Sequence, residues 1–118
     1  MRIEIKGYSS PDIIDFRNFE PISKESFSFL LELEIGMEEI EGSDLFSVEV
    51  CTPKWLLENH QSYDVLLGRY KVIVFEYDID NIISALERHI NSKVGNSWAD
   101  VAKHISKIAH WEFDDYKE

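Results

Sequence analysis

The sequence predicts an α+β fold, in which an antiparallel β-sheet of about four to six strands has two C-terminal helices packed on one face. Apolar and polar residues alternate with a period of two in several segments of the first half of the chain, as they do in β-strands. Two longer segments with apolar residues at helical spacing follow residue 79. Strands that precede helices, instead of alternating with them, are typical of this class.

Length and composition predict one domain over residues 1–118. The chain has 118 residues, of which 44% are hydrophobic, so it is long enough to bury a core but too short for a second domain. Its 7 Phe, 5 Tyr and 3 Trp residues argue against disorder, although 30% of the residues are charged. We therefore expect a compact globular protein.

The charge balance indicates which partners the protein avoids. Asp and Glu number 23 against 12 Lys and Arg, which gives a formal net charge of -11. A field of this sign repels phosphate backbones and anionic lipid head groups, so we expect neither nucleic acid nor membrane as a partner, but a basic protein surface. Cys51 is the single cysteine and no run of about 18 apolar residues occurs, so a cytoplasmic location follows by default.

Strands are predicted from alternation and from β-branched or aromatic content. The predicted strands are residues 1–7, 13–19, 27–35, 45–51, 70–77 and 111–113. In the first, Met1, Ile3 and Ile5 share one face. The segment 70–77, YKVIVFEY, is apolar almost throughout, which favours a central strand with both faces covered.

Helices are predicted from capping residues and apolar stripes. Thr52 followed by Pro53 is typical of a helix start and begins a short helix. Asp80 caps a second helix that ends near residues 94–95, and Ser97 opens a third with a variant of the capping box. Their apolar stripes are Ile82, Ile83, Leu86 and Ile90 in the second, and Trp98, Val101, Ala102, Ile105, Ile108 and Ala109 in the third.

The predicted hairpin of residues 27–51 has one apolar face and one acidic face. Strand alternation places the carboxylates of Glu32, Glu34 and Glu49 on the face opposite the core. Like charges on neighbouring strands reduce stability, so their presence points to a use. The connection between the strands adds further acids, namely Glu38, Glu39, Glu41 and Asp44. We predict that all these carboxylates bind a partner, with Trp55 as an aromatic contact.

A plainer interpretation treats the outer face of these strands as an ordinary solvated surface. If the first strand lies beside the second, Arg2 and Lys6 pair with Glu32 or Glu34, and each exposed pair contributes only about 0.2–1 kcal/mol. The connection has no basic residue nearby in the sequence and should remain negative. The prediction of partner binding is therefore strongest for residues 38–44.

No catalytic, metal or cofactor site is predicted. His60, His89, His104 and His110 lack the short spacing that lets two imidazoles share a metal on one helix or strand. The 5 glycines stand singly at turns, so there is no phosphate-binding loop. Cys51 has no basic neighbour to stabilise a thiolate, which favours an inert thiol.

Several spaced aromatic and turn residues resemble the Imm8 family of bacterial immunity proteins. They are Val48-Glu49-Val50-Cys51-Thr52-Pro53-Lys54-Trp55-Leu56, Gly68-Arg69-Tyr70 before an apolar strand, Ser97-Trp98 at a helix start, and Trp111-Glu112-Phe113 through Tyr116. The resemblance covers residues 43–116. It implies a small cytoplasmic protein, without catalytic motif, that binds and neutralises a cognate polymorphic or contact-dependent toxin.

Charge and resemblance favour the same function. Toxin domains that attack nucleic acids present basic clefts, which an acidic domain complements, so a nuclease is one toxin that fits. Two other classes stay open. One is a general acidic interaction or adaptor domain, which includes a homodimer through an exposed sheet edge. The other, ranked last, is a small enzyme that uses polar groups such as His60, Glu49 and Cys51.

Overall fold

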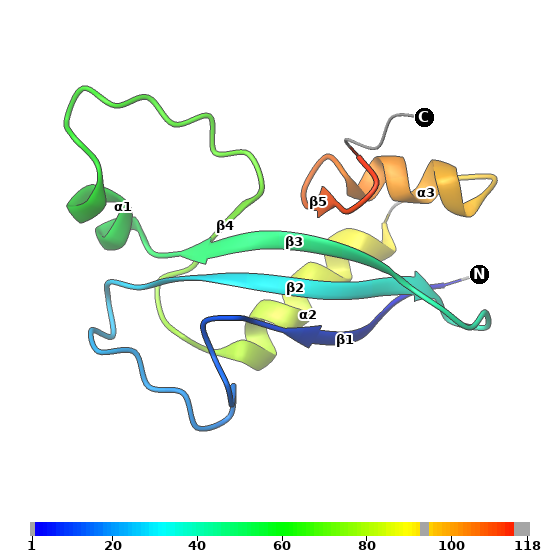
Figure 1. Cartoon of the computed structure of the whole chain (residues 1–118), viewed down its shortest axis with the longest axis horizontal. Helices are drawn as coiled ribbons and strands as arrows, with labels where there is room; N and C mark the ends of the chain where they lie inside the picture. The colour runs from blue at the N-terminus through cyan, green and yellow to red at the C-terminus, as the bar shows by residue number, and fades with distance from the viewer. Residues whose placement is uncertain (1, 93–94, 115–118) are drawn as a thin grey trace.

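The computed structural model describes residues 2–92 and 95–114, and its strands form one sheet (Figure 1). The strands are β1 (Ile3–Ser9), β2 (Ser28–Met37), β3 (Asp44–Cys51), β4 (Lys71–Ile73) and β5 (His110–Trp111). They lie in the order β1-β2-β3-β4, and β5 also pairs with β3. All pairings are antiparallel except that of β3 with β4, which is parallel.

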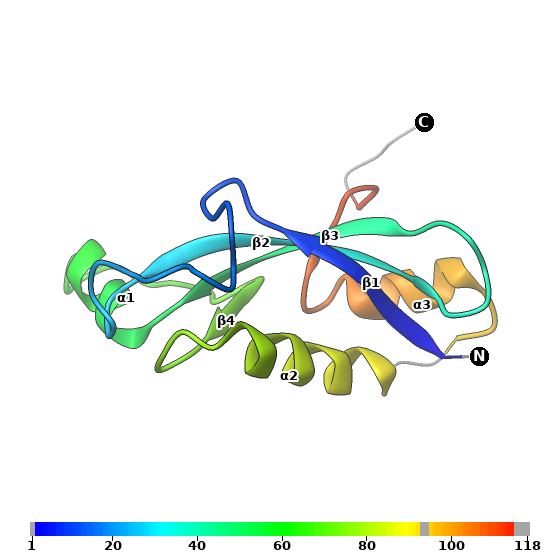
Figure 2. The same cartoon turned by 90° about the horizontal axis from the view of Figure 1, so that it is seen from below.

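The described residues form three helices, α1 (Pro53–Asn59), α2 (Ile79–Asn91) and α3 (Trp98–Ile105). Figure 2 shows α2 and α3 on the same side of the sheet, and within the described residues no helix covers the opposite side. The short α1 lies at one end of the sheet (Figure 1). The predicted α+β class is confirmed, with a five-stranded, mostly antiparallel sheet and two C-terminal helices.

The hydrophobic core lies between the sheet and the two C-terminal helices. Leu31 lies opposite Val48, and Leu33 lies opposite Phe46, with at most 1% of any of the four side chains exposed. The helices close the core with Ile82, Leu86, Ile90, Val101, Ala102 and Ile105. Burial of each large apolar side chain contributes about 1.5–3 kcal/mol, so the predicted apolar stripes are what hold α2 and α3 on the sheet.

The first predicted strand is confirmed as β1, which continues to Ser9. Ile3 is buried against the core, while Met1 lies outside the described residues. A register shift follows Ile5, after which Gly7 lies opposite Glu34. This bulge increases the local twist and leaves one residue of β1 unpaired.

Residues 13–19 do not form the strand that the sequence predicted. Asp15 instead accepts a hydrogen bond from the backbone N–H of Arg17 at 3.0 Å. Asp12 accepts one from the backbone N–H of Leu30 at 2.8 Å, at the part of β2 beyond the end of β1. Bonds from side chain to backbone compete with strand pairing, which explains the irregular path of this segment.

The prediction of a central strand over residues 70–77 is wrong. Only β4 pairs, at the edge of the sheet, and 46% of Ile73 and 79% of Phe75 are exposed. After β4 the chain leaves the sheet and passes to α2 (Figure 2). Within residues 70–77, Val72 and Val74 are half-buried, whereas Ile73 and Phe75 between and after them are exposed. The parallel pairing follows because α1 and the connection after it return the chain along β3.

The predicted cap of the first helix is confirmed. The Oγ1 of Thr52 accepts hydrogen bonds from the backbone N–H groups of Trp55 and Phe27, each at 3.2 Å. Pro53 occupies the first helical position, where its missing N–H has no cost. The hydroxyl of the fully buried Thr52 therefore joins the start of α1 to the residue before β2.

The second helix begins earlier than predicted. Asp78, not Asp80, is the cap, and its Oδ1 accepts a hydrogen bond from the backbone N–H of Asn81 at 3.1 Å. Asp80 lies in the first turn and pairs with Arg17 at 2.6 Å. Either aspartate suits the start of a helix, but only Asp78 has the extended backbone that a capping residue needs. The helix ends at Asn91, before the predicted end near residues 94–95, and residues 93–94 lie outside the described residues.

The third helix begins as predicted, but the last strand is shorter. Ser97 accepts a hydrogen bond from the backbone N–H of Asp100 at 3.3 Å. The Asp100 carboxylate bonds to the backbone N–H of Asn96 at 3.3 Å, one residue before the position that a capping box uses. β5 contains only two residues, and Phe113 lies in the turn that follows.

Candidate partner-binding surface

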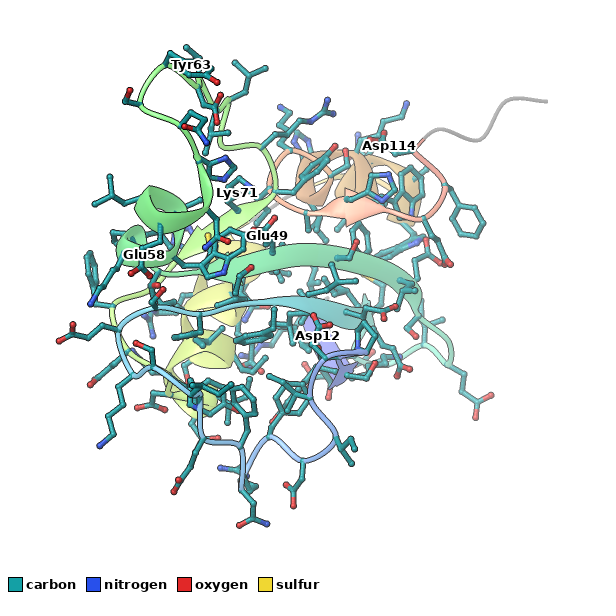
Figure 3. All side chains as sticks on the ribbon, turned by 60° about the vertical axis from the view of Figure 1, so that its left-hand side comes forward. Asp12, Glu49, Glu58, Tyr63, Lys71 and Asp114 are labelled. Atoms are coloured by element: carbon teal, nitrogen blue, oxygen red, sulfur yellow. The ribbon has the colours of Figure 1, made fainter. Side chains whose placement is uncertain are left out.

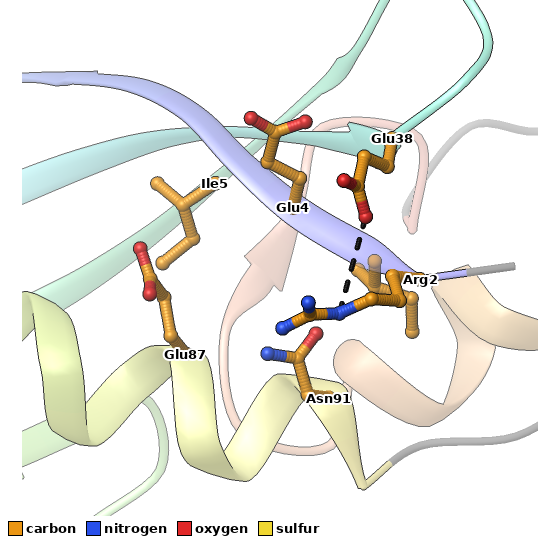
Figure 4. Close-up of a pocket in the computed structure, with 7 residues that line it drawn as sticks. Arg2, Glu4, Ile5, Glu38, Glu87 and Asn91 are labelled. Atoms are coloured by element: carbon orange, nitrogen blue, oxygen red, sulfur yellow. Dashed lines mark ion pairs between the residues drawn. The ribbon is translucent and has the colours of Figure 1, made fainter.

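The side of the sheet without helices, here termed the open face, carries the predicted strand carboxylates. Its side chains include Glu4, Leu30, Glu32, Glu34, Ser47 and Glu49. Glu4 points away from α2 toward this side (Figure 4). Glu34 lies over β1, where a Cβ on Gly7 would come within 2.8 Å of its Oε2. The glycine at position 7 therefore leaves room for this carboxylate.

Glu49 has a compensated charge. Its Oε2 lies 3.0 Å from the Nζ of Lys71, and its Oε1 accepts a hydrogen bond from the Oγ of Ser28 at 3.1 Å. Figure 3 shows Glu49 and Lys71 on the neighbouring strands β3 and β4. Only 19% of the Lys71 side chain is exposed, so salt screens this pair less than a pair on the surface.

The plainer interpretation expected Arg2 and Lys6 to pair with Glu32 or Glu34 of β2, but neither residue does so. The Nε of Arg2 lies 3.9 Å from the Oε2 of Glu38 (Figure 4). The Nζ of Lys6 donates a hydrogen bond to the backbone carbonyl of Ile40. The bulge in β1 explains the difference, because it displaces Lys6 from the β2 register. Among the described residues, no ion pair reaches the β2 carboxylates.

The connection between β2 and β3 folds back over the end of the open face. A Cβ on Gly36 would lie 2.5 Å from the carbonyl oxygen of Gly42, so only glycine allows this approach. Gly42 itself has a φ of 99°, a conformation that favours glycine. The glutamates of the connection follow the carboxylates of β2 in the chain and are exposed, and Glu38 points toward Arg2 on the α2 side of β1 (Figure 4). We term this set the acidic surface, which consists of Glu32, Glu34, Glu38, Glu39 and Glu41.

Asp44, another predicted contact residue, has a structural role. Its Oδ2 accepts hydrogen bonds from the indole N–H of Trp98 at 2.7 Å and of Trp111 at 2.9 Å. The ring of Trp111 also stacks on Phe46, with centroids 6.3 Å apart. Asp44 therefore joins β3 to α3 and β5. The sequence predicted Trp98 in the apolar stripe of its helix but not this shared partner.

Trp55, the predicted aromatic contact, lies half-buried on α1. Its ring is 6.1 Å from the ring of His60, and the Nδ1 of His60 lies 3.6 Å from the carboxylate of Asp64. Trp55 is therefore packed on one side and accessible on the other. Its position is next to the connection that leads from α1 to β4.

Sequence reasoning missed the exposed apolar residues that follow Trp55. The most exposed of them are Leu57, Tyr63, Val65, Leu67 and Phe75. Val65, Leu66 and Leu67 form an apolar run between predicted elements, and this run is the signal that could have indicated an exposed contact.

The groups that a small enzyme would use are engaged elsewhere. Cys51 is fully buried, and burial raises the pKa of its thiol above the ordinary value, with a smaller effect from the charge of Glu49. No group of three or more His, Cys, Asp or Glu side chains in residues 2–92 and 95–114 is placed to hold a metal ion. In the same part of the chain, no helix has the length and apolar character to cross a membrane.

Exposed carboxylates of this kind complement a basic protein surface, which fits a protein-binding domain. Comparison with protein families gives the particular identity: the model of Immunity protein 8, Imm8, matches residues 3–116. The chain therefore belongs to the Imm8 immunity protein family, as the resemblance implied. Members are non-enzymatic inhibitors, so the chain neutralises a cognate toxin. No curated protein and no solved structure matches it.

Proposed function

We propose that this immunity protein neutralises its toxin by placing the acidic surface against a basic cleft of the toxin domain. The observation that supports the proposal is the run of carboxylates along β2 and the connection after it. Glu32 and Glu34 lie on the face that no described helix covers, and Glu38, Glu39 and Glu41 are exposed. Arg2 is the one basic side chain that pairs with any of them in the described part of the chain, and that contact, at 3.9 Å, is solvent-exposed. With Arg2 beside Glu38 and the Nζ of Lys6 on the carbonyl of Ile40, two cations lie at this surface of five carboxylates, which leaves an excess of negative charge for a partner.

A nuclease toxin suits this surface best. Enzymes that act on nucleic acids attract phosphates with Lys and Arg, and a carboxylate surface satisfies the same groups. Bound there, the inhibitor would exclude the substrate sterically and neutralise the field that attracts it. The complex would form in the cytoplasm of the cell that makes both proteins.

Asp44, Glu49 and Trp55 have supporting roles in this proposal. Asp44 accepts hydrogen bonds from two indole N–H groups, and Glu49 pairs with Lys71. Each of these carboxylates therefore adds less to the negative potential that a partner meets. Trp55 is half-buried on α1 and offers part of its ring as a contact.

Charge reversal tests the acidic surface directly. We expect the triple variant Glu38→Lys, Glu39→Lys and Glu41→Lys to slow association with the toxin domain by at least about tenfold at low salt. The three side chains are exposed, so the variant should fold like the parent. The measurement is the association rate by surface plasmon resonance at several salt concentrations, together with neutralisation in cells that co-express the toxin.

The matched control reverses three exposed carboxylates away from the acidic surface, namely Glu20, Glu25 and Asp80. It changes the net charge by the same amount, so any effect of net charge alone appears in both variants. An unchanged association rate and intact neutralisation in the first variant would show that another face binds the toxin.

The neighbouring gene provides an independent test of the toxin class. We expect the gene immediately upstream to encode a large secreted protein with a variable C-terminal domain, and that domain is the toxin for the experiments above. A neighbour without such a domain, together with self-association in analytical ultracentrifugation, would instead favour an adaptor or homodimer.

A further inference from the structure

The outer edge of β1 has backbone groups that no neighbouring strand uses. The backbone N–H of Glu38 donates to the carbonyl of Arg2 at 2.9 Å, so these two residues form a hydrogen-bonded pair of the antiparallel ladder. Bonded positions alternate along antiparallel strands, so the N–H and C=O groups of Ile3 and Ile5 point away from β2. Within the described residues, no other segment forms a hydrogen bond with these backbone groups.

β1 is also the longer of the two edges of the sheet. It has 7 residues, whereas the opposite edge is divided between β4, with 3 residues, and β5, with 2. Figure 2 views the sheet from the side of β1 and shows α2 beneath the sheet. An edge strand with unpaired backbone groups is a template for an extended segment of another chain. The edge of β1 is therefore a candidate site for the addition of a strand.

A groove of about 220 Å³ lies beside this edge, between β1 and α2. Glu87 and Asn91 line it from α2, and Figure 4 shows both side chains pointing from the helix toward β1. The two residues are four positions apart and so share one face of the helix. Successive side chains of a strand point to opposite faces, so a strand added to β1 would direct alternate side chains at Glu87 and Asn91.

The groove has an excess of negative charge. Its described lining includes the carboxylates of Glu4, Glu38 and Glu87 and the guanidinium of Arg2. Glu4 points to the open face, as does the ammonium of Lys6, which donates to a carbonyl of the β2–β3 connection. On the α2 side, two carboxylates therefore face one guanidinium.

Glu87 is the carboxylate that remains for a partner. Arg2 pairs with Glu38, and no ion pair in the described part of the chain involves Glu87. A Lys or Arg side chain on an added strand would form a charge-assisted hydrogen bond with this carboxylate.

The bulge after Ile5 limits how much of the edge can pair. Bulges twist an edge strand away from pairing, and lysines protect edges in the same way, as Lys6 does here. An added strand therefore pairs only with the part of β1 before the bulge. Each residue has one N–H and one C=O, so Ile3 and Ile5 offer two donors and two acceptors.

Continuity with the acidic surface decides the occupant. Glu38 belongs to that surface and also lines the groove, so a toxin domain bound to the acidic surface reaches the edge of β1 within the same contact. A second copy of the chain would bring another net charge of -11 to the same carboxylates, which disfavours pairing between two β1 edges.

We propose that an extended segment of the toxin domain adds to the sheet along the first part of β1 and directs a basic side chain at Glu87. This inference rests on the proposed function and extends the acidic surface around the edge of the sheet. Backbone pairing supplies contacts that do not depend on charge, while Glu87 selects a basic side chain at one position. The two contacts can be tested separately.

Hydrogen exchange of single amides tests the backbone pairing. The probe is the purified C-terminal domain encoded by the upstream gene, mixed with the whole immunity protein. We expect the amides of Ile3 and Ile5 to exchange at least about tenfold more slowly in the complex than in the protein alone, because they gain an acceptor. The amide of Glu4, which points toward β2, is the internal control and should be protected in both states.

Charge reversal tests the basic side chain. We expect Glu87→Lys to raise the dissociation constant of the complex at least about tenfold, because it places two cations together in the groove. The matched control is Glu76→Lys, which changes the net charge equally and lies in a different pocket, beside Asn81 and Ala85. Both glutamates are exposed, so the melting temperature should stay the same in both variants.

Each outcome decides the inference. Slower exchange at Ile3 and Ile5, with weaker binding by Glu87→Lys alone, supports the added strand. Unchanged exchange of both amides in the complex overturns it, and so does an equal effect of Glu87→Lys and Glu76→Lys. Protection that rises with the concentration of the immunity protein alone would assign the edge to a second copy and also overturn it.

Failure here is distinct from failure of the proposed function. If the triple reversal of Glu38, Glu39 and Glu41 slows association while the two amides stay unprotected, the acidic surface stands and the added strand does not. If the amides are protected and the triple reversal has no effect on association, the acidic surface fails instead.

Discussion

At the scale of single residues, Asp44 shows how one side chain can join three elements. Its Oδ2 receives two indole N–H groups, one from α3 and one from β5, within 2.9 Å. Hydrogen bonds to a charged acceptor contribute about 1.5–3 kcal/mol each, more than most surface contacts. Asp44 therefore supports the packing of the C-terminal part of the chain on β3.

Removing this carboxylate should destabilise the fold. We expect Asp44→Ala to lower the free energy of unfolding by about 2–3 kcal/mol, because two indole N–H groups lose their acceptor in a partly buried place. Urea unfolding followed by tryptophan fluorescence measures the change. Glu41→Ala, an exposed acid in the same connection, is the control and should change stability by less than about 0.5 kcal/mol. Equal effects would refute the structural role of Asp44.

At the scale of elements, the β2–β3 connection depends on the absence of a side chain at Gly36. The carbonyl of Gly42 occupies the place that a Cβ would need. At Gly7, by contrast, a Cβ would meet only the end of the flexible Glu34 side chain, at 2.8 Å. The two glycines therefore differ in what must move when a methyl group is added.

Alanine substitutions separate these cases. We expect Gly36→Ala to lower the free energy of unfolding by about 2 kcal/mol, since the connection must shift as a whole. Gly7→Ala should cost under about 1 kcal/mol because Glu34 can rotate away. Thermal unfolding followed by circular dichroism gives both values. A larger loss at Gly7 than at Gly36 would contradict the packing described for the connection.

Elements also show which patterns can mislead. Residues 70–77 have the composition of a central strand, yet β4 is a short edge strand, because composition does not reveal where the chain must leave the sheet. The hairpin was predictable, since its alternation leaves one arrangement that buries Phe, Leu and Val on the same face. The segment 13–19 was not, because Asp12 and Asp15 compete locally for backbone groups.

At the scale of the whole molecule, Cys51 reports on global stability. Burial raises the pKa of its thiol, so the folded protein binds this proton more tightly than the unfolded chain does. The resulting stabilisation is present below the ordinary thiol pKa and is lost as the pH rises above it. At neutral pH the thiol is protonated and inaccessible.

Labelling with a thiol reagent should therefore require unfolding. We expect native protein at neutral pH to react at a rate that follows the global unfolding equilibrium and rises steeply with urea. Protein denatured in urea, which reacts at once, is the control. Rapid labelling of the native protein would show that β3 opens locally at this end.

The candidate site was predictable in part. The acids of residues 38–41 were recognisable because they have no basic neighbour in sequence, and the fold keeps them exposed. The engagement of Asp44 by two tryptophans and of Glu49 by Lys71 could not be predicted, because the partners are 54, 67 and 22 residues away. The exposed apolar residues after Trp55 were missed because apolar residues are normally assigned to the core.

The sequence by itself determined the α+β class, the apolar face of the hairpin, the caps at Thr52 and Ser97, and the Imm8 family. These features are local, since they depend on alternation, helical spacing and residues close together in the chain. Tertiary structure alone decided the parallel edge strand, the partners of Arg2 and Lys6, and which carboxylates have a basic partner. Those outcomes depend on contacts between distant segments, and such contacts exist only once the sheet has assembled.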